Sequence, residues 1–122
     1  MPWAVVQCYQ HTQGGGRGVE VPCISAEEFA EKYRSGALKD ATLLDVREWE
    51  EWLVDRLEEA EFLPLSSFPP PPGRLNPEKP IYVFCAHGVR SVYATDLLLR
   101  QGYPRVIHVE GGLARVRLLL EK

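Results

Sequence analysis

Residues 84–91, with the sequence FCAHGVRS, place a cysteine directly after an apolar run and before a short loop containing glycine and arginine. Cysteine is nucleophilic as a thiolate, and an unperturbed thiol, with a pKa of about 8.5, is only slightly ionised at neutral pH. A reactive Cys85 therefore needs neighbours that stabilise an anion. Alternatively, Cys85 is a small buried hydrophobic residue at the end of a strand.

The loop after Cys85 carries groups that suit an anion. If a strand ends at Cys85 and a helix begins at Ser91, loop N–H groups can point inward and the helix N-terminus adds partial positive charge. Gly88 allows a tight turn, and Arg90 adds a permanent cation. The expected catalytic residue is Cys85, and the expected substrate-binding residues are Ala86, His87, Gly88, Val89, Arg90 and Ser91.

Strand and helix patterns alternate along the chain. Strands are predicted within residues 3–10, 19–24, 41–46, 81–85 and 105–112, with a short strand starting at Glu61. Helices are predicted within residues 25–36, 47–60, 91–104 and 113–122. This order predicts an α/β protein with a small, mostly parallel sheet flanked by helices on both faces. Ligands of such sheets bind beyond the carboxyl ends of the strands, where Cys85 lies.

Local signals set several element ends. Ser25 and Glu28 match a capping box at the start of a helix, and Gly36 predicts its end. In residues 47–60, Trp49, Trp52 and Leu53 are the expected apolar positions. Four consecutive prolines at residues 69–72 exclude a helix interior or a central strand, so this segment is predicted to be a stiff connection.

Composition narrows the class of protein. The chain has 122 residues, of which 45% are hydrophobic and 25% charged, and its formal net charge is -3, as in a single globular domain. No signal peptide or membrane segment is expected, so a cytoplasmic location is the prediction. Nucleic acid and membranes are not expected partners. The cysteines at positions 8, 23 and 85 have no metal-ligand spacing, which predicts free thiols and no metal site.

Four segments in order resemble the rhodanese-like sulfurtransferase family: ISAEEF, LLDVREWEEW, IYVFCAHGVRS and VIHVEGGLA. The β-forming residues and glycines of residues 1–18 predict an N-terminal strand or arm with a glycine-rich loop, and the resemblance implies a rhodanese-like domain at residues 19–122. The chain departs from the family pattern at residues 55–60, which read DRLEEA, and at Val116, where the family usually has tryptophan.

The resemblance also implies a reaction. Cys85 would take a sulfane sulfur from thiosulfate or another persulfide donor, hold it as a persulfide and pass it to cyanide or a thiol. Arg90 and the loop amides would bind the anionic donor, while Asp45 and Arg47 would support the site. No cofactor is expected, and the expected partners are a small anionic sulfur donor and a protein persulfide donor or acceptor.

Several alternatives stay open at this point. One is a non-catalytic rhodanese-like module that binds partners or senses oxidants. Another is a cysteine-dependent phosphatase, although the six residues from Cys85 to Arg90 match the sulfur-handling members, whose phosphatase relatives carry one more. Cys8 or Cys23 could resolve Cys85 as a disulfide, but packing is the simpler role. His108 is expected in a strand, and His87 either transfers protons or adds polarity. The sequence does not determine the physiological donor and acceptor, the oligomeric state or the role of the prolines.

Overall fold

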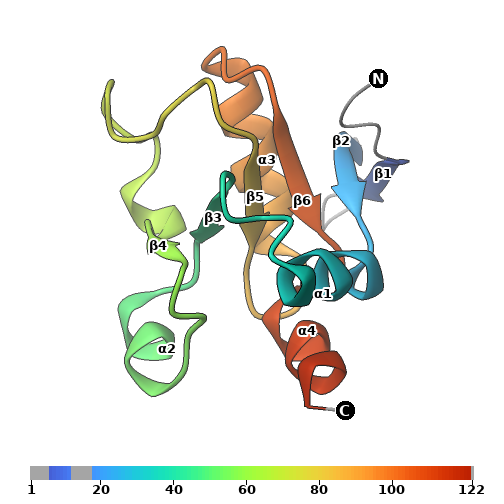
Figure 1. Cartoon of the computed structure of the whole chain (residues 1–122). Helices are drawn as coiled ribbons and strands as arrows, with labels where there is room; N and C mark the ends of the chain where they lie inside the picture. Colours follow the sequence, from blue (N-terminus) through green and yellow to red (C-terminus); the bar gives the residue numbers. More distant parts are fainter. Residues whose placement is uncertain (1–5, 12–17, 122) are drawn as a thin grey trace.

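The computed structural model describes residues 6–11 and 18–121. Six strands form one sheet in the order β1-β2-β6-β5-β3-β4. The strands are β1 (Val6–His11), β2 (Gly18–Ile24), β3 (Thr42–Asp45), β4 (Glu61–Phe62), β5 (Ile81–Phe84) and β6 (Val106–Val109). β1 pairs antiparallel with β2, and the other neighbours pair in parallel. Figure 1 shows this arrangement.

Four α-helices connect and cover these strands. They are α1 (Ala26–Ser35), α2 (Trp49–Val54), α3 (Arg90–Arg100) and α4 (Gly112–Leu120). A short 3₁₀ turn, Leu65–Ser67, follows β4. The predicted small, mostly parallel sheet with helices on both faces is confirmed. The predicted domain limits at residues 18 and 19 stay a prediction, and residues 1–5 and 12–17 of the proposed arm lie outside the described residues.

The central strands are buried on both faces, and successive side chains enter two separate cores. One core joins Leu43, Tyr82 and Phe84 to Phe29 of α1 and Leu113 of α4. The other core includes Leu44, Val83 and Cys85 together with Ala94 and Leu98 of α3. This alternation explains why the strands are apolar throughout, as expected for a parallel sheet covered on both sides.

The ends of α1 follow the predicted signals. The Ser25 side chain accepts a hydrogen bond from the Glu28 amide at 3.0 Å. At the other end Gly36 adopts a left-handed conformation with φ 82°, and its N–H is bonded to carbonyls of the last turn. The helix therefore begins and ends where the sequence predicted.

The helix predicted over residues 47–60 is much shorter in the structure. α2 covers only Trp49–Val54, and it has no buried residue. Trp49 and Leu53 are 54% and 58% exposed, so the apolar face predicted for them is wrong. α2 lies at the β4 edge of the sheet, where the rings of Trp49 and Trp52 contact the ring of Phe62, at centroid distances of 5.7 and 5.0 Å.

The thiols also differ from expectation. Cys85 is free and buried, but Cys23 is disulfide-bonded, which contradicts the prediction of three free thiols. The side chain of Cys8 lies outside the described residues. Among the described residues, every helix is too short or too polar to cross a membrane.

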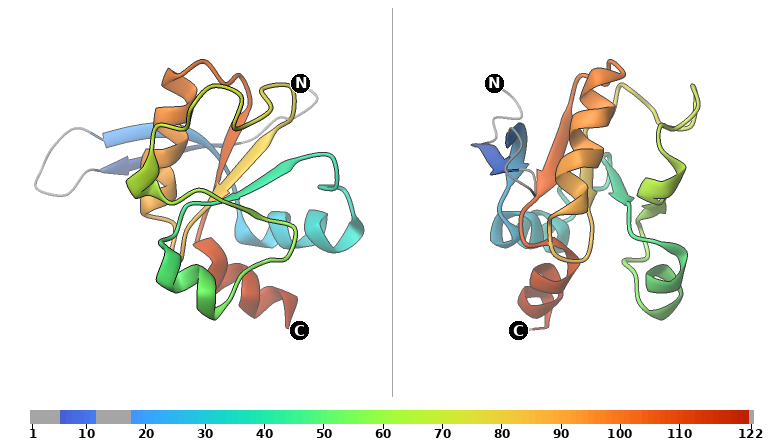
Figure 2. Two further views of the ribbon diagram at one scale, coloured as in Figure 1. Left: turned by 90° about the vertical axis from the view of Figure 1, so that its left-hand side faces the viewer. Right: turned by 180° about the vertical axis from the view of Figure 1, so that it is seen from behind.

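The carboxyl ends of β3, β5 and β6 meet at one edge of the sheet. There, α2 and α4 lie on opposite sides of the loop that leaves β5, as the views in Figures 1 and 2 agree. Parallel pairing of Asp45 with Phe84 places the end of β3 beside Cys85. The fold thus brings the motifs of the sequence to one place.

Candidate functional site

Cys85 follows β5, and its sulfur lies at the base of the loop. The Sγ atom accepts hydrogen bonds from the amides of Gly88 and Ser91, at 3.2 and 3.4 Å, and its thiol donates to the Ser91 hydroxyl oxygen at 3.4 Å. The residue is 1% exposed. The two amides lie beside the first turn of α3, so the loop and the helix N-terminus direct partial positive charge at the position of the sulfur.

Further loop amides are available to a ligand. Among the described residues, the amides of Ala86, His87 and Val89 have no hydrogen-bond acceptor. α3 begins at Arg90, with Val89 as its N-terminal cap, one residue before the predicted start. The loop therefore combines donors already bound to sulfur with donors left open, as the sequence predicted for an anion site.

A pair of glycines holds the loop against α4. The amides of Leu113 and Ala114 donate to the carbonyls of Cys85 and Ala86, at 2.8 and 3.0 Å. A Cβ on Gly112 would lie 2.6 Å from these carbonyl oxygens, and one on Gly88 would lie 2.9 Å from the Gly111 amide. The start of the loop is thus fixed to α4 through its carbonyls, and the amides of Gly88 and Ser91 face the sulfur.

Behind the sulfur, a buried polar chain runs into the sheet. The Ser91 hydroxyl lies 2.9 Å from Nδ1 of His108 in β6. Burial lowers the pKa of His108 to about 4, so the ring is neutral at pH 7. This geometry agrees with the prediction of a hydrogen-bonded strand histidine. It also gives His108 a contact with the loop that the sequence did not reveal.

Arg90 has a partner that the sequence analysis missed. Its two terminal nitrogens donate to the two carboxylate oxygens of Glu51 in α2, at 2.7 and 2.8 Å. Each side chain is about one third exposed (34% and 33%). The hydrogen bonds from Arg90 lower the pKa of Glu51 to about 2, and Glu51 in turn raises the pKa of Arg90. Arg90 thus lies at the loop as predicted, but bound to the neighbouring helix.

Asp45 and Arg47 form a second, deeper pair. Nε and Nη2 of Arg47 bind the Asp45 carboxylate at 2.8–3.1 Å, and the Arg47 amide donates to the same group at 3.0 Å. The two side chains are 7% and 0% exposed. This ion pair fixes the end of β3 beside the cysteine loop.

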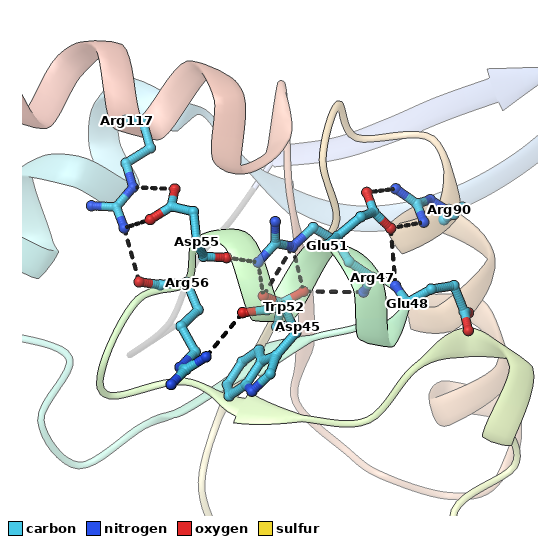
Figure 3. Close-up of polar contacts among 9 residues, drawn as sticks. All are labelled: Asp45, Arg47, Glu48, Glu51, Trp52, Asp55, Arg56, Arg90 and Arg117. Atoms are coloured by element: carbon cyan, nitrogen blue, oxygen red, sulfur yellow. Dashed lines mark hydrogen bonds and ion pairs between the residues drawn. The ribbon is translucent and has the colours of Figure 1, made fainter.

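The segment that departs from the family pattern, residues 55–60, is bonded to Arg47 and to Arg117 of α4. Arg47 Nη2 also donates to the Asp55 carbonyl at 2.5 Å. The Asp55 carboxylate pairs with Arg117 of α4 at 2.5 and 2.9 Å, and Arg117 bonds the Arg56 carbonyl at 2.8 Å. Figure 3 shows these contacts from Arg117 to Arg47 and Asp45, and beside them the separate pair of Arg90 and Glu51. The basic residue in α4 is the only sequence signal that could have indicated a link.

The remaining predicted residues are placed as follows. His87 and Val89 are exposed at the loop, and Ala86 is half-buried. Val116, at the place of the family's usual tryptophan, is buried in the core that α1 and α4 cover. The structure therefore brings all the predicted loop residues around Cys85, with Asp45 and Arg47 on the adjoining strand end.

Comparisons with known proteins agree with this geometry. The family model described as "Rhodanese-like domain" matches residues 25–118. The uncharacterized protein YqhL of Bacillus subtilis is 32% identical over 92 residues, covering 75% of this chain and 69% of YqhL. Thiosulfate sulfurtransferase GlpE of Actinobacillus pleuropneumoniae is 33% identical over 72 residues, covering 59% of this chain and 67% of GlpE.

Solved structures give the same result. The human single-domain sulfurtransferase TSTD1 superposes with a TM-score of 0.67 at 26% identity, covering 83% of this chain and 98% of TSTD1. Some relatives are longer, and the chain spans only 49% and 34% of the length of two of them. With its matched region, its fold and its cysteine loop taken together, the chain belongs to the rhodanese-like domain family.

Proposed function

We propose that this protein is a sulfurtransferase that carries sulfane sulfur on Cys85. The observation that supports the proposal best is the sulfur of Cys85, which accepts bonds from two loop amides at the N-terminus of α3. A persulfide on this residue would place its outer sulfur among the open amides of the loop. The names of GlpE and TSTD1 support the same activity class.

The proposed cycle has two balanced steps. The Cys85 thiolate attacks the outer sulfur of thiosulfate, a new S–S bond forms, and the old S–S bond breaks to release sulfite. Cyanide or a thiolate then attacks the outer sulfur of the persulfide, and the electron pair of the breaking S–S bond returns to Cys85. Each step is a nucleophilic displacement at sulfur, for which the loop amides stabilise the developing charge.

Two kinds of group at the loop would bind the anionic donor. Open amides at Ala86, His87 and Val89 would bind the anionic donor directly. Arg90, held by Glu51, would supply a fixed positive charge at the rim. Thiosulfate as the donor, a protein that carries a persulfide as a partner, and a cytoplasmic location are parts of this proposal.

Persulfide formation tests the proposal directly. The purified protein is incubated with thiosulfate, and intact-mass and peptide spectra are searched for one added sulfur atom on Cys85. Cyanide is then added, and thiocyanate is measured. We expect the adduct to form, to disappear with cyanide, and to be absent from Cys85→Ser.

The controls separate the other functions. Absence of both adduct and thiocyanate would overturn the proposal and favour a non-catalytic module. Hydrolysis of an aryl phosphate by the wild type, abolished in Cys85→Ser, would favour a phosphatase.

A further inference from the structure

The short helix α2 carries much of the exposed apolar surface of the protein. Among the described residues, the exposed large hydrophobic side chains are Trp49, Leu53, Val54, Val89, Leu97 and Leu118. Three of them belong to α2, which has six residues and buries none, and Val54 is 86% exposed. Figures 1 and 2 show α2 at an outer corner of the molecule. Neighbouring apolar side chains that are exposed mark a surface where a protein binds another molecule.

Helix geometry places two of these apolar side chains around one carboxylate. Residues three and four positions apart are neighbours on a helix surface, so Glu50 lies beside both Leu53 and Val54. At the end of α2, an open hollow of about 610 Å³ is lined by Leu53, Val54, Asp55, Arg56 and Glu58. We call the surface formed by Glu50, Leu53, Val54 and Glu58 the α2 face.

The α2 face lies in the most acidic part of the chain. Residues 48–61 contain seven acidic residues and one basic residue, in a chain whose formal net charge is -3. Arginines of other elements pair with three of the seven, namely Glu51, Asp55 and Glu61. Glu50 and Glu58 are exposed, and neither side chain forms an ion pair or hydrogen bond within residues 6–11 and 18–121. Arg56, whose guanidinium lies over the Trp52 ring, offsets only one of these charges.

The α2 face adjoins the rim of the cysteine loop. Val54 lies three residues after Glu51 and is therefore its neighbour on the helix surface. Glu51 in turn accepts two hydrogen bonds from Arg90, as Figure 3 shows. Val89, the loop residue before Arg90, is 61% exposed. A partner that covers the α2 face and Val89 therefore lies at the loop that follows Cys85.

The size and the charge of the α2 face define the partner. Thiosulfate and cyanide are too small to cover the exposed side chains of a helix, whereas a protein surface covers them. Negative charge repels nucleic acid, acidic lipids and the α2 face of a second copy of this chain. A protein surface with basic and apolar side chains complements both the carboxylates and the exposed leucine and valine.

We propose that the α2 face docks a protein whose reactive cysteine is surrounded by basic and apolar side chains. This proposal rests on the proposed function, in which Cys85 carries the sulfur. The partner's thiolate attacks the outer sulfur of the Cys85 persulfide, a new S–S bond forms, and the old S–S bond breaks with its electron pair returning to Cys85. The partner leaves as a persulfide, and no outside oxidant or reductant is needed.

Binding is tested first, without any sulfur transfer. The probe is a short peptide in which serine, in place of cysteine, is flanked by leucines and arginines. It is titrated into the protein while amide chemical shifts of Leu53, Val54 and Val89 are recorded. We expect saturable shifts at these residues, and none with a peptide in which glutamates replace the arginines. Added salt should weaken binding of the basic peptide, because salt screens exposed charges.

Matched variants separate the α2 face from the rest of the surface. Leu53→Ser should weaken binding of the basic peptide roughly fivefold, because apolar contact is lost. Leu118→Ser changes a leucine of α4 with the same exposed fraction, 58%, and should leave binding unchanged. Glu50→Gln should weaken binding roughly threefold. Glu20→Gln changes an exposed carboxylate of β2 and should have no effect. Thermal unfolding checks the fold of all four variants.

The transfer step is tested with persulfidated protein in single turnover. The cysteine forms of the basic and acidic peptides are compared at equal thiolate concentration, and each rate is divided by the rate of the same protein with cyanide. We expect the wild type to favour the basic peptide roughly tenfold. A double variant with Leu53→Ser and Glu50→Gln should lose most of this preference, whereas one with Leu118→Ser and Glu20→Gln should keep it.

The outcomes separate this proposal from the proposed function. If no persulfide forms, the proposed function fails, while the titration with the serine peptide still decides whether the α2 face binds basic, apolar chains. If the basic peptide does not bind, or if the control variants weaken binding equally, the docking surface is wrong even when persulfide forms. Equal rates with the two cysteine peptides in the wild type would also overturn it.

Self-association is the remaining alternative for this surface. Sedimentation equilibrium of the wild type and of Leu53→Ser tests it. We expect a monomer in both cases, since like charges repel. A wild-type dimer that Leu53→Ser dissociates would show that a second copy covers the α2 face, and the proposed partner would be wrong.

Discussion

Two arginine–carboxylate pairs flank the cysteine loop, and they differ in almost every physical respect. Arg47 and Asp45 are two residues apart and nearly fully buried, with side chains 7% and 0% exposed. Arg90 and Glu51 come from different helices, 39 residues apart in the sequence, and each is about one third exposed. Both pairs are fork-shaped, so the geometry of the bonds alone does not distinguish them.

The difference lies in what surrounds each pair. A buried charge that loses its partner stays in a medium of low polarity, so breaking such a pair is costly. An exposed charge that loses its partner is solvated by water, and the pair contributes little to stability. We therefore assign Arg47 and Asp45 to holding the fold of the site, and Arg90 and Glu51 to setting the charge at its rim.

The largest expected effect comes from breaking the buried pair. Asp45→Asn leaves the Arg47 guanidinium buried without its carboxylate and should lower the free energy of unfolding by about 3–5 kcal/mol. Urea unfolding measures the loss. Glu61→Gln, which breaks the exposed pair with Arg74, is the control and should cost less than about 1 kcal/mol. Equal losses in the two variants would contradict the comparison.

The buried hydrogen bond between Ser91 and His108 involves a neutral ring, and it shows how burial alone affects stability. Burial lowers the pKa of His108 from 6.5 to about 4, so below pH 6.5 the unfolded chain binds a proton that the folded protein excludes. The free energy of unfolding is therefore highest, as far as His108 determines it, above pH 6.5, and it decreases as the pH falls toward 4. Between pH 7 and pH 5 the loss should be about 2 kcal/mol.

Urea unfolding at pH 7, 6 and 5 measures this slope in the wild type and in His108→Gln. The variant should lack that part of the slope, because glutamine does not titrate. His87→Gln changes an exposed histidine and should keep the wild-type slope. If His108→Gln keeps the slope as well, other groups cause the pH dependence.

The third effect should appear in donor binding. Arg90→Lys keeps the charge but loses the fork that Glu51 fixes, so stability should change by less than about 1 kcal/mol. The thiosulfate concentration for half-maximal persulfide formation should rise roughly tenfold, or about 1.4 kcal/mol. Arg100→Lys, in the exposed pair with Asp96 on the same helix, should change neither quantity. An unchanged thiosulfate dependence in Arg90→Lys would remove Arg90 from donor binding.

The smallest effect should follow from the partner carboxylate. Glu51→Gln breaks the exposed pair and should cost less than about 1 kcal/mol at pH 7. Because Arg90 lowers the pKa of Glu51 to about 2, this contribution is present above pH 4.5 and is lost as the pH falls toward 2. Urea unfolding in about 1 M NaCl should remove most of the difference from wild type, since salt screens exposed charges. If the difference in the free energy of unfolding stays the same in salt, the pair of Arg90 and Glu51 behaves like the buried pair of Asp45 and Arg47, and the comparison is wrong.

Much of the fold followed from short-range patterns. Ser25 and Gly36 marked the ends of α1 correctly, and the apolar runs marked β3, β5 and β6. The helix over residues 47–60 was overestimated, because charged helix-forming residues continue past Val54 while the chain turns at Asp55 to bond Arg47 and Arg117. Those partners lie 8 and 62 residues away, and a local pattern carries no information about them.

The sequence by itself determined the chemistry that the site can perform. A cysteine after a buried strand, followed by Gly88 and by a helix start, specifies where a sulfur and its amides will lie, because backbone geometry there is local. Only the tertiary structure decided which side chains form hydrogen bonds and ion pairs with one another. It placed Glu51 on Arg90, Arg117 on Asp55 and His108 behind Ser91. Side-chain pairing across strands and helices depends on packing at long range, and the same residues in another fold would have other partners.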